Sequence, residues 1–90
     1  MNILKQKFLI DKEFITLGQF LKEVNEIPSG GMAKWYLQEH VVLVDGEVEN
    51  RRGRKLRAGT MVELPDGGIF FMDQELEDVT PIQDDLDETI

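Results

Sequence analysis

The chain has 90 residues, of which 41% are hydrophobic and 31% are charged, and its formal net charge is -8 at pH 7. A chain of this length predicts one small domain with a thin core, because only about 60% of its unfolded surface can be buried. The lack of cysteine excludes disulfides, thiolate metal sites and a cysteine nucleophile.

The sequence predicts neither a membrane span nor a secretory signal. No apolar run approaches the roughly 20 residues that a membrane span requires. The N-terminal "MNILKQKFLI" is interrupted by Lys5 and Lys7 and lacks a small-residue cleavage site, so it does not read as a secretory signal. We therefore expect a cytoplasmic protein.

The negative charge is concentrated at the C-terminal end. Residues 73–90 hold eight acids and no Lys or Arg, which leaves ten acids and ten bases in residues 1–72. Five of these bases lie in residues 51–57, hereafter the basic segment: Arg51, Arg52, Arg54, Lys55 and Arg57. Such a cluster in an otherwise neutral body indicates an anionic ligand.

The first predicted elements are a strand and a helix. Residues 8–10 form a short apolar run that favours a strand, and a polar turn follows at residues 11–13. Thr16 is a predicted N-cap. The helix that follows has one apolar face at helical spacing, made of Leu17, Phe20, Leu21 and Val24. Pro28 is predicted to end this helix, because the residue before a proline is disfavoured in the α region.

A second helix is predicted in "SGGMAKWYLQEH". Its entry is Ser29, Gly30 and Gly31, and it ends near His40. Its predicted core face is Ala33, Tyr36 and Leu37. The next stretch, "VVLVDGEVE", has β-branched residues on both sides of Asp45-Gly46, a pair that favours a tight hairpin turn with positive φ.

The remaining residues complete an α+β fold. The basic segment leads out of the hairpin, "MVEL" alternates as a further strand, and residues 69–72 can pair back on it as a last strand. We expect two helices packed on a small, mostly antiparallel sheet in a single domain of residues 1–72. Residues 73–90 are expected to be a disordered acidic tail.

The order of these motifs resembles the small RNA-binding module named after ribosomal protein S4. The resemblance covers residues 16–64 and includes "SGGMAK", "VVLVDGEVE" and "LRAGTMVEL". The opening "SGGMAK" and the extra strands look most like the stand-alone YaaA-like and YbcJ-like proteins. The resemblance implies an RNA-binding fold called the alpha-L motif, a non-catalytic role in ribosome assembly or translation, and structured RNA, ribosomal above all, as the partner.

The chain departs from the family pattern at four positions. Thr16, Gly30 and Trp35 stand where family members often carry arginine, which removes some of the usual phosphate contacts. His40 replaces a glycine that normally ends the second helix with positive φ, and we expect His40 to take that conformation at some cost.

Two regions are candidates for phosphate binding. The forked guanidinium groups of the basic segment are suited to phosphate binding. The alternative is a solvated loop whose charges prevent other strands from pairing with an exposed sheet edge. At the second-helix entry, the N–H groups of Gly30, Gly31 and Met32 are expected to point outward, with Lys34 one turn further on. The alternative at this entry is ordinary N-capping by Ser29.

Two further side chains leave alternatives open. We expect Trp35 either to stack on an unpaired base or to pack over the hairpin as part of the core. His40 is the only histidine, which excludes a catalytic triad and a multi-histidine metal site, and we expect no metal or cofactor.

The sequence therefore predicts a monomeric, non-catalytic protein that recognises structured RNA through the basic segment and the second-helix entry. The alternative is a protein-interaction adaptor whose acidic tail engages a basic partner. The tail itself has three interpretations: a solubilising end, a competitor that folds over the basic segment, or a docking segment.

Overall fold

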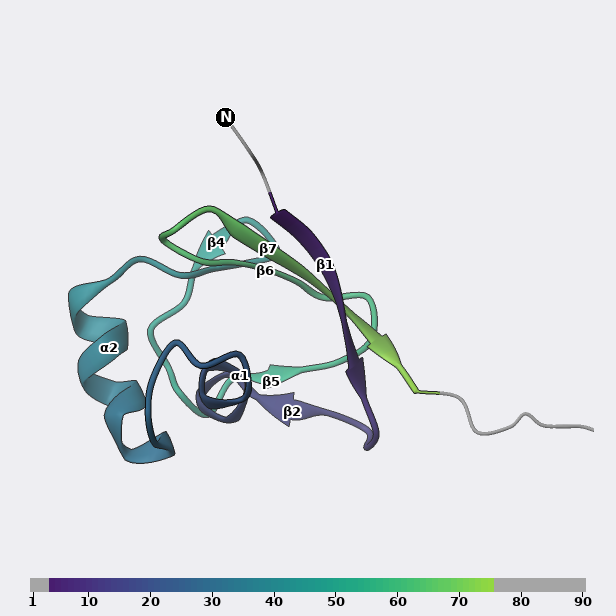
Figure 1. Ribbon diagram of the computed structural model, residues 1–90, viewed down its shortest axis with the longest axis horizontal. Coiled ribbons are helices and arrows are strands. Elements are labelled where there is room, and N and C mark those ends of the chain that lie inside the picture. Colours follow the sequence, from purple (N-terminus) through teal and green to yellow (C-terminus); the bar gives the residue numbers. More distant parts are fainter. Residues whose placement is uncertain (1–3, 76–90) are drawn as a thin grey trace, which may run out of the picture.

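Two helices and two small sheets make up the computed structural model, which describes residues 4–75 (Figure 1). The larger sheet has five strands in the order β1 (Leu4–Ile10), β7 (Gly68–Gln74), β6 (Met61–Glu63), β3 (Leu43–Val44) and β4 (Glu47–Val48). The smaller sheet pairs β2 (Ile15–Thr16) with β5 (Lys55–Leu56). The helical elements are α1 (Leu17–Glu23), the 3-10 helix η1 (Gly30–Met32) and α2 (Ala33–Glu39).

The sheet is mostly antiparallel, as predicted. Strand β6 pairs antiparallel with β7 and with β3, and β3 pairs antiparallel with β4. Strand β1 is the exception, because it runs parallel to β7 from the pair Leu4 and Gly68 to the pair Ile10 and Gln74. The α+β prediction is confirmed, while the length of β1 and its parallel pairing were not predicted.

The core lies between the five-stranded sheet and α1, which Figure 1 shows nearly end-on beneath the strands. Phe20 is fully buried at its centre. The Phe20 ring meets Phe8 of β1 and Phe70 of β7 edge-to-face, each at a centroid distance of 5.1 Å. Such aromatic pairs contribute about 0.5–1.5 kcal/mol beyond the apolar area that they bury.

The start of α1 is capped as the sequence predicted. The N–H of Gln19 donates to Thr16 Oγ1 at 3.2 Å, and the N–H of Thr16 donates to Gln19 Oε1 at 3.1 Å. This reciprocal pair satisfies two N–H groups that the helix itself leaves without acceptors.

The end of α1 differs from the prediction that Pro28 stops it. The helix ends at Glu23, and Asn25 adopts a φ of 64°. The N–H groups of Asn25 and Glu26 then donate to the carbonyls of Lys22 and Leu21. This is a Schellman arrangement, so asparagine in the left-handed region ends the helix before the proline can.

The second helix begins as the 3-10 helix η1 and continues as α2, with Ala33 and Leu37 buried and Tyr36 half-buried. It ends at Glu39 with His40 as its C-cap, near the predicted end, but the expected positive φ is wrong, because His40 has a φ of -132°. The chain passes straight into an extended conformation, so no left-handed residue is needed. In the hairpin, Asp45 and Gly46 have φ values of 52° and 84°, which confirms the predicted turn.

Strand β7 continues past residue 72. Asp73 lies in β7 opposite Leu9, and its carboxylate is 3.6 Å from Lys7 Nζ. Pairing with β1 thus places Asp73 and Gln74, the first two residues of the expected tail segment, in the sheet. The predicted disorder of the later acidic residues concerns positions outside the described part of the chain.

Across residues 4–75, neither helix has the length and apolar character that crossing a membrane demands.

Candidate functional site

The backbone of the basic segment is fixed to the start of α1. The N–H of Leu17 donates to the carbonyl of Arg54 at 2.8 Å, and the N–H of Gly18 donates to the carbonyl of Arg52 at 2.9 Å. Immediately afterwards, Lys55 pairs with Thr16 between β5 and β2. The basic segment therefore supplies acceptors for the first turn of α1, and this contact determines where its side chains emerge.

Gly18 brings the two candidate regions together. A Cβ atom at this position would lie 3.3 Å from the Cβ of Ala33 and 3.4 Å from both the Cβ and the carbonyl oxygen of Arg52. Ala33 is the first residue of α2 and Arg52 belongs to the basic segment. Because position 18 carries no side chain, the start of α2 and the basic segment can approach α1 at the same place.

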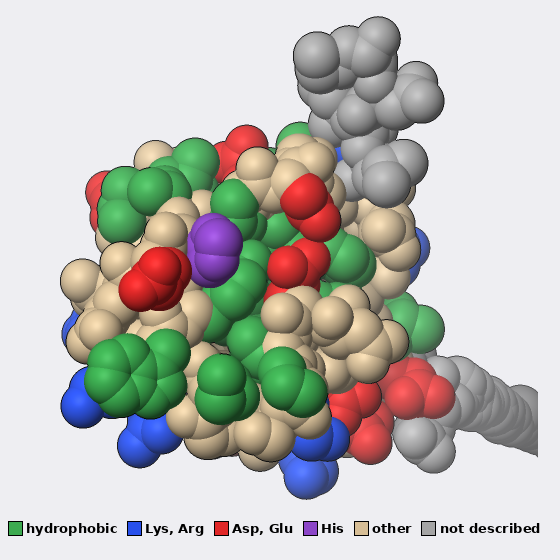
Figure 2. Space-filling model, turned by 60° about the vertical axis from the view of Figure 1, so that its left-hand side comes forward, with side chains coloured by type: hydrophobic (Ala, Val, Ile, Leu, Met, Phe, Trp, Pro, Cys, Tyr) green, Lys and Arg blue, Asp and Glu red, His purple; other side chains and the backbone are tan. Residues whose placement is uncertain are grey.

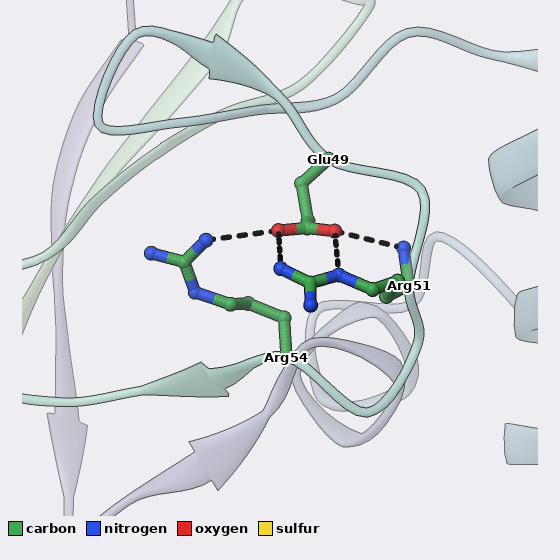
Figure 3. A network of polar contacts seen from close by, with 3 residues as sticks. All are labelled: Glu49, Arg51 and Arg54. Carbon is green, nitrogen blue, oxygen red and sulfur yellow. Dashed lines mark hydrogen bonds and ion pairs between the residues drawn. The ribbon is translucent and has the colours of Figure 1, made fainter.

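Glu49 is a buried carboxylate at the base of the basic segment, with 6% of the residue exposed (Figure 3). It accepts four hydrogen bonds, three of them from Arg51: the backbone N–H at 3.0 Å, Nε at 2.9 Å and Nη2 at 3.1 Å. The fourth comes from Arg54 Nη1 at 2.8 Å. The Arg51 side-chain bonds, together with the other donors, outweigh burial and lower the pKa of Glu49 to about 2.

This carboxylate divides the basic segment into two groups. Arg51 and Arg54 are anchored on Glu49, although 73% of the Arg51 side chain remains exposed. Arg52, Lys55 and Arg57 form no ion pair with any acid among residues 4–75. The second group therefore carries the positive charge that is least neutralised within this part of the molecule.

Phe14 supports two of these cations. Lys55 Nζ lies 4.9 Å from the centroid of the half-buried Phe14 ring, and the guanidinium carbon of Arg57 lies 5.3 Å from it. Both distances are within the range of cation–π attraction. The ring therefore holds Lys55 and Arg57 side by side without cancelling their charge.

The second-helix entry is exposed and open. The expectation that the N–H of Met32 is unpaired is wrong, because it donates to the carbonyl of Ser29 at 3.0 Å. The Ser29 side chain makes no capping hydrogen bond, which contradicts the N-capping alternative. A Cβ at Gly30 would meet nothing within 4 Å, so packing does not require glycine there. Lys34 is exposed at the start of α2.

Trp35 lies on the surface, with 58% of the residue exposed, so the core alternative is wrong. It lines a groove of about 310 Å³ between α2 and the connection that follows α1, at residues 26–28. Figure 2 faces this side of the molecule and shows apolar side chains gathered close to Lys and Arg side chains along the lower edge. One cation is close to Trp35, because Lys34 Nζ lies 6.0 Å from the centroid of its ring.

A comparison with protein families identifies this arrangement. The model of a family described as "S4 domain" matches residues 8–70, which is more than half of the chain. The chain belongs to the S4 domain family. It is also 62% identical over 61 residues to the "Probable ribosome maturation protein RlbA" of Bacillus subtilis (strain 168), covering 68% of this chain and 86% of that protein.

The S4 domain match is wider than the region that carried the resemblance. It begins at Phe8 in β1 and ends at Phe70 in β7, whereas the motifs quoted from the sequence lie within residues 16–64. The match thus includes the end of β1 and the start of β7. The high coverage of the RlbA protein agrees with the resemblance to stand-alone members of this family.

Three residues that position the S4 domain's charged surface were missed in the sequence. Glu49 precedes Arg51 and Arg54 by two and five positions, a spacing that could have suggested an internal ion pair. Gly18 and Phe14 gave no comparable signal, because their partners are remote in the sequence. The ten predicted site residues all lie on α2, its entry or the basic segment, and Gly18 connects these regions.

Proposed function

We propose that this protein binds structured RNA, without catalysis, and acts in ribosome assembly or translation. The observation that supports the proposal is the packing of Ala33, the first residue of α2, and of Arg52 against Gly18, because it brings the start of α2 and the basic segment close together. The name of the Bacillus subtilis relative supports a ribosomal RNA as the target.

The proposed contacts divide between the two regions. Ser29, Gly30, Gly31 and Lys34 bind one stretch of phosphates through backbone N–H groups and an ammonium group. Arg52, Lys55 and Arg57 bind a neighbouring stretch. Contacts of this kind follow the shape of folded RNA more than its sequence.

Arg51 and Arg54 have a second task in this proposal. Because Glu49 holds Arg51 through two side-chain bonds, that guanidinium loses little rotamer freedom when a phosphate approaches its exposed side. Arg54 shares the same carboxylate and shapes the segment more than it contacts RNA. Trp35 is the proposed stacking residue at the edge of the surface.

The decisive test is fluorescence anisotropy of a structured ribosomal RNA fragment titrated with the full chain across a salt series. Replacement of Arg52, Lys55 and Arg57 by Ala should weaken binding at least tenfold, because fewer cations on the surface release fewer counterions from the RNA. The matched control replaces Lys5, Lys7 and Lys12 by Ala, which removes the same charge from β1 and the turn after it.

With three to five phosphates engaged, log K should fall with log salt at a slope of about -2 to -4.5. The triple variant of the basic segment should lose roughly two to three units of that slope, and the control variant should keep it. Equal affinity of the two triple variants, with folding verified by circular dichroism, would refute the proposed surface.

A further inference from the structure

The groove beside Trp35 has a chemistry distinct from that of the basic segment. Its apolar surface includes Trp35 and Met32, which are 58% and 44% exposed. Its charged lining residues are Glu26 and Glu39, and no Lys or Arg lines it among the residues described. The groove is therefore apolar with acidic groups, although the ammonium group of Lys34 lies near the Trp35 ring.

This chemistry excludes the RNA backbone and suits a base. Carboxylates repel phosphate oxygens, whereas a flat heterocycle gains from contact with indole and thioether surfaces. A volume of about 310 Å³ is ample for one base. Carboxylate oxygens can also accept hydrogen bonds from the amino groups of a base edge.

The groove begins where the proposed phosphate contacts end. Met32 closes the η1 turn that follows Gly30 and Gly31, and it also lines the groove. Lys34 Nζ lies 6.0 Å from the centroid of the Trp35 ring. A strand whose phosphate rests against the second-helix entry would thus bring its base toward Trp35.

The two carboxylates are not equivalent. Glu26 Oε1 accepts the hydroxyl of Tyr36 at 3.0 Å, so one of its oxygens is engaged within the protein. Burial, with this hydrogen bond, raises the pKa of Tyr36 and keeps the hydroxyl protonated as a donor. Glu39 is exposed, and no side chain among residues 4–75 forms an ion pair with it. Guanine is the base that presents two adjacent donors, an imino N–H and an amino group, to such a carboxylate.

We propose that this groove binds an unpaired guanine that projects from RNA held on the basic segment and the second-helix entry, an inference that rests on the proposed function. Trp35 stacks on the base, Met32 packs against it, and Glu39 accepts hydrogen bonds from its Watson–Crick edge. The RNA recognised is then a helix with a bulged or looped guanine, in place of a uniform duplex.

Trp35 is the only tryptophan of the chain, so its fluorescence reports directly on the groove. The experiment titrates the full chain with RNA hairpins that differ at one bulged nucleotide, G, A, C or U, and with an uninterrupted hairpin. Anisotropy of labelled RNA measures total binding in the same samples. We expect Trp35 quenching and the highest affinity with the G bulge, and no quenching with the uninterrupted hairpin.

Variants separate stacking from edge recognition. Trp35→Ala should weaken binding of the G-bulge hairpin by roughly 5- to 100-fold, a much larger loss than that for the uninterrupted hairpin. Glu39→Gln should reduce the preference for G by about tenfold while quenching persists. The matched control is Leu9→Ala, which truncates an apolar residue of similar exposure, 52%, on β1.

Three results would overturn the inference. RNA binding by anisotropy without Trp35 quenching would leave the proposed function intact and remove the base site. Equal quenching by all four bulges would contradict the proposal that Glu39 makes the groove prefer guanine. Quenching by a 12-residue Lys- and Leu-containing peptide, but by no hairpin, would assign the groove to a basic protein segment. Failure of every hairpin to bind would instead refute the proposed function itself.

Discussion

At the scale of single residues, Glu49 determines how the basic segment is built. It is buried, and four donors from Arg51 and Arg54 surround its carboxylate. Removing its charge leaves two guanidinium groups without their anion. We expect Glu49→Gln to lower the free energy of unfolding by about 2–3 kcal/mol. Urea unfolding at pH 7 measures this effect, and the matched control is Glu47→Gln, which alters an exposed residue of the same hairpin and should change stability by less than about 0.5 kcal/mol.

The same residue predicts a pH dependence. The pKa of Glu49 is lowered to about 2 in the folded protein from an ordinary value of 4.5. Its contribution to stability is therefore complete above pH 4.5 and is lost as the pH falls toward 2. The difference in unfolding free energy between the parent and Glu49→Gln should shrink over that interval. A constant difference from pH 7 to pH 2.5 would contradict the assignment of the ion pair.

The sequence predicts where the basic residues lie but not which of them are paired. Counting charges identified the basic segment, and exposure of Arg52 and Lys55 agrees with that prediction. Counting could not show that Arg51 and Arg54 share a buried acid, because burial of Glu49 depends on how the hairpin packs.

At the scale of elements, the close approach at Gly18 is the feature that holds the two regions of the site together. A valine side chain at this position would press on Ala33 and on the backbone of Arg52. We expect Gly18→Val to destabilise the domain by about 1–3 kcal/mol and to weaken RNA binding by more than the lower stability explains. Gly53→Val is the matched control, because a Cβ at Gly53 would meet nothing within 4 Å. Identical RNA affinities of the two folded variants would count against the joined surface.

The end of α1 gives a second test at this scale. Asn25 has a φ of 64°, and the residue before Pro28 does not end the helix. Asn25→Ala should cost about 1–2 kcal/mol, because alanine enters the left-handed region with difficulty. Asn25→Gly should be neutral or stabilising, and Pro28→Ala should change stability by less than about 0.5 kcal/mol. Thermal unfolding of the three variants would reveal whether proline, and not asparagine, sets the boundary.

At the scale of the whole molecule, charge is distributed unevenly. Residues 76–90 contain six acids and no Lys or Arg, so truncation after Glu75 changes the formal charge from -8 to -2. We expect the truncated chain to bind structured RNA several-fold more tightly at low salt, with the advantage decreasing as salt rises, because like charges repel RNA over a screened distance. Anisotropy titrations of the two chains at several salt concentrations measure this difference in affinity.

A full-length variant with these six acids changed to Asn or Gln serves as the matched control. It should behave like the truncated chain if charge is the cause. An affinity equal to that of the parent would show that the length of the segment, and not its charge, matters.

The sequence by itself determined the local structure and the chemistry of this protein. The capped start of α1, the Asp45-Gly46 turn and the basic segment all depend on neighbours within a few residues, so spacing and propensity were sufficient. Tertiary structure decided which charges remain available. The parallel pairing of β1 with β7, the meeting of Gly18 with Ala33 and Arg52, and the exposure of Trp35 depend on contacts between remote segments, which local spacing does not encode.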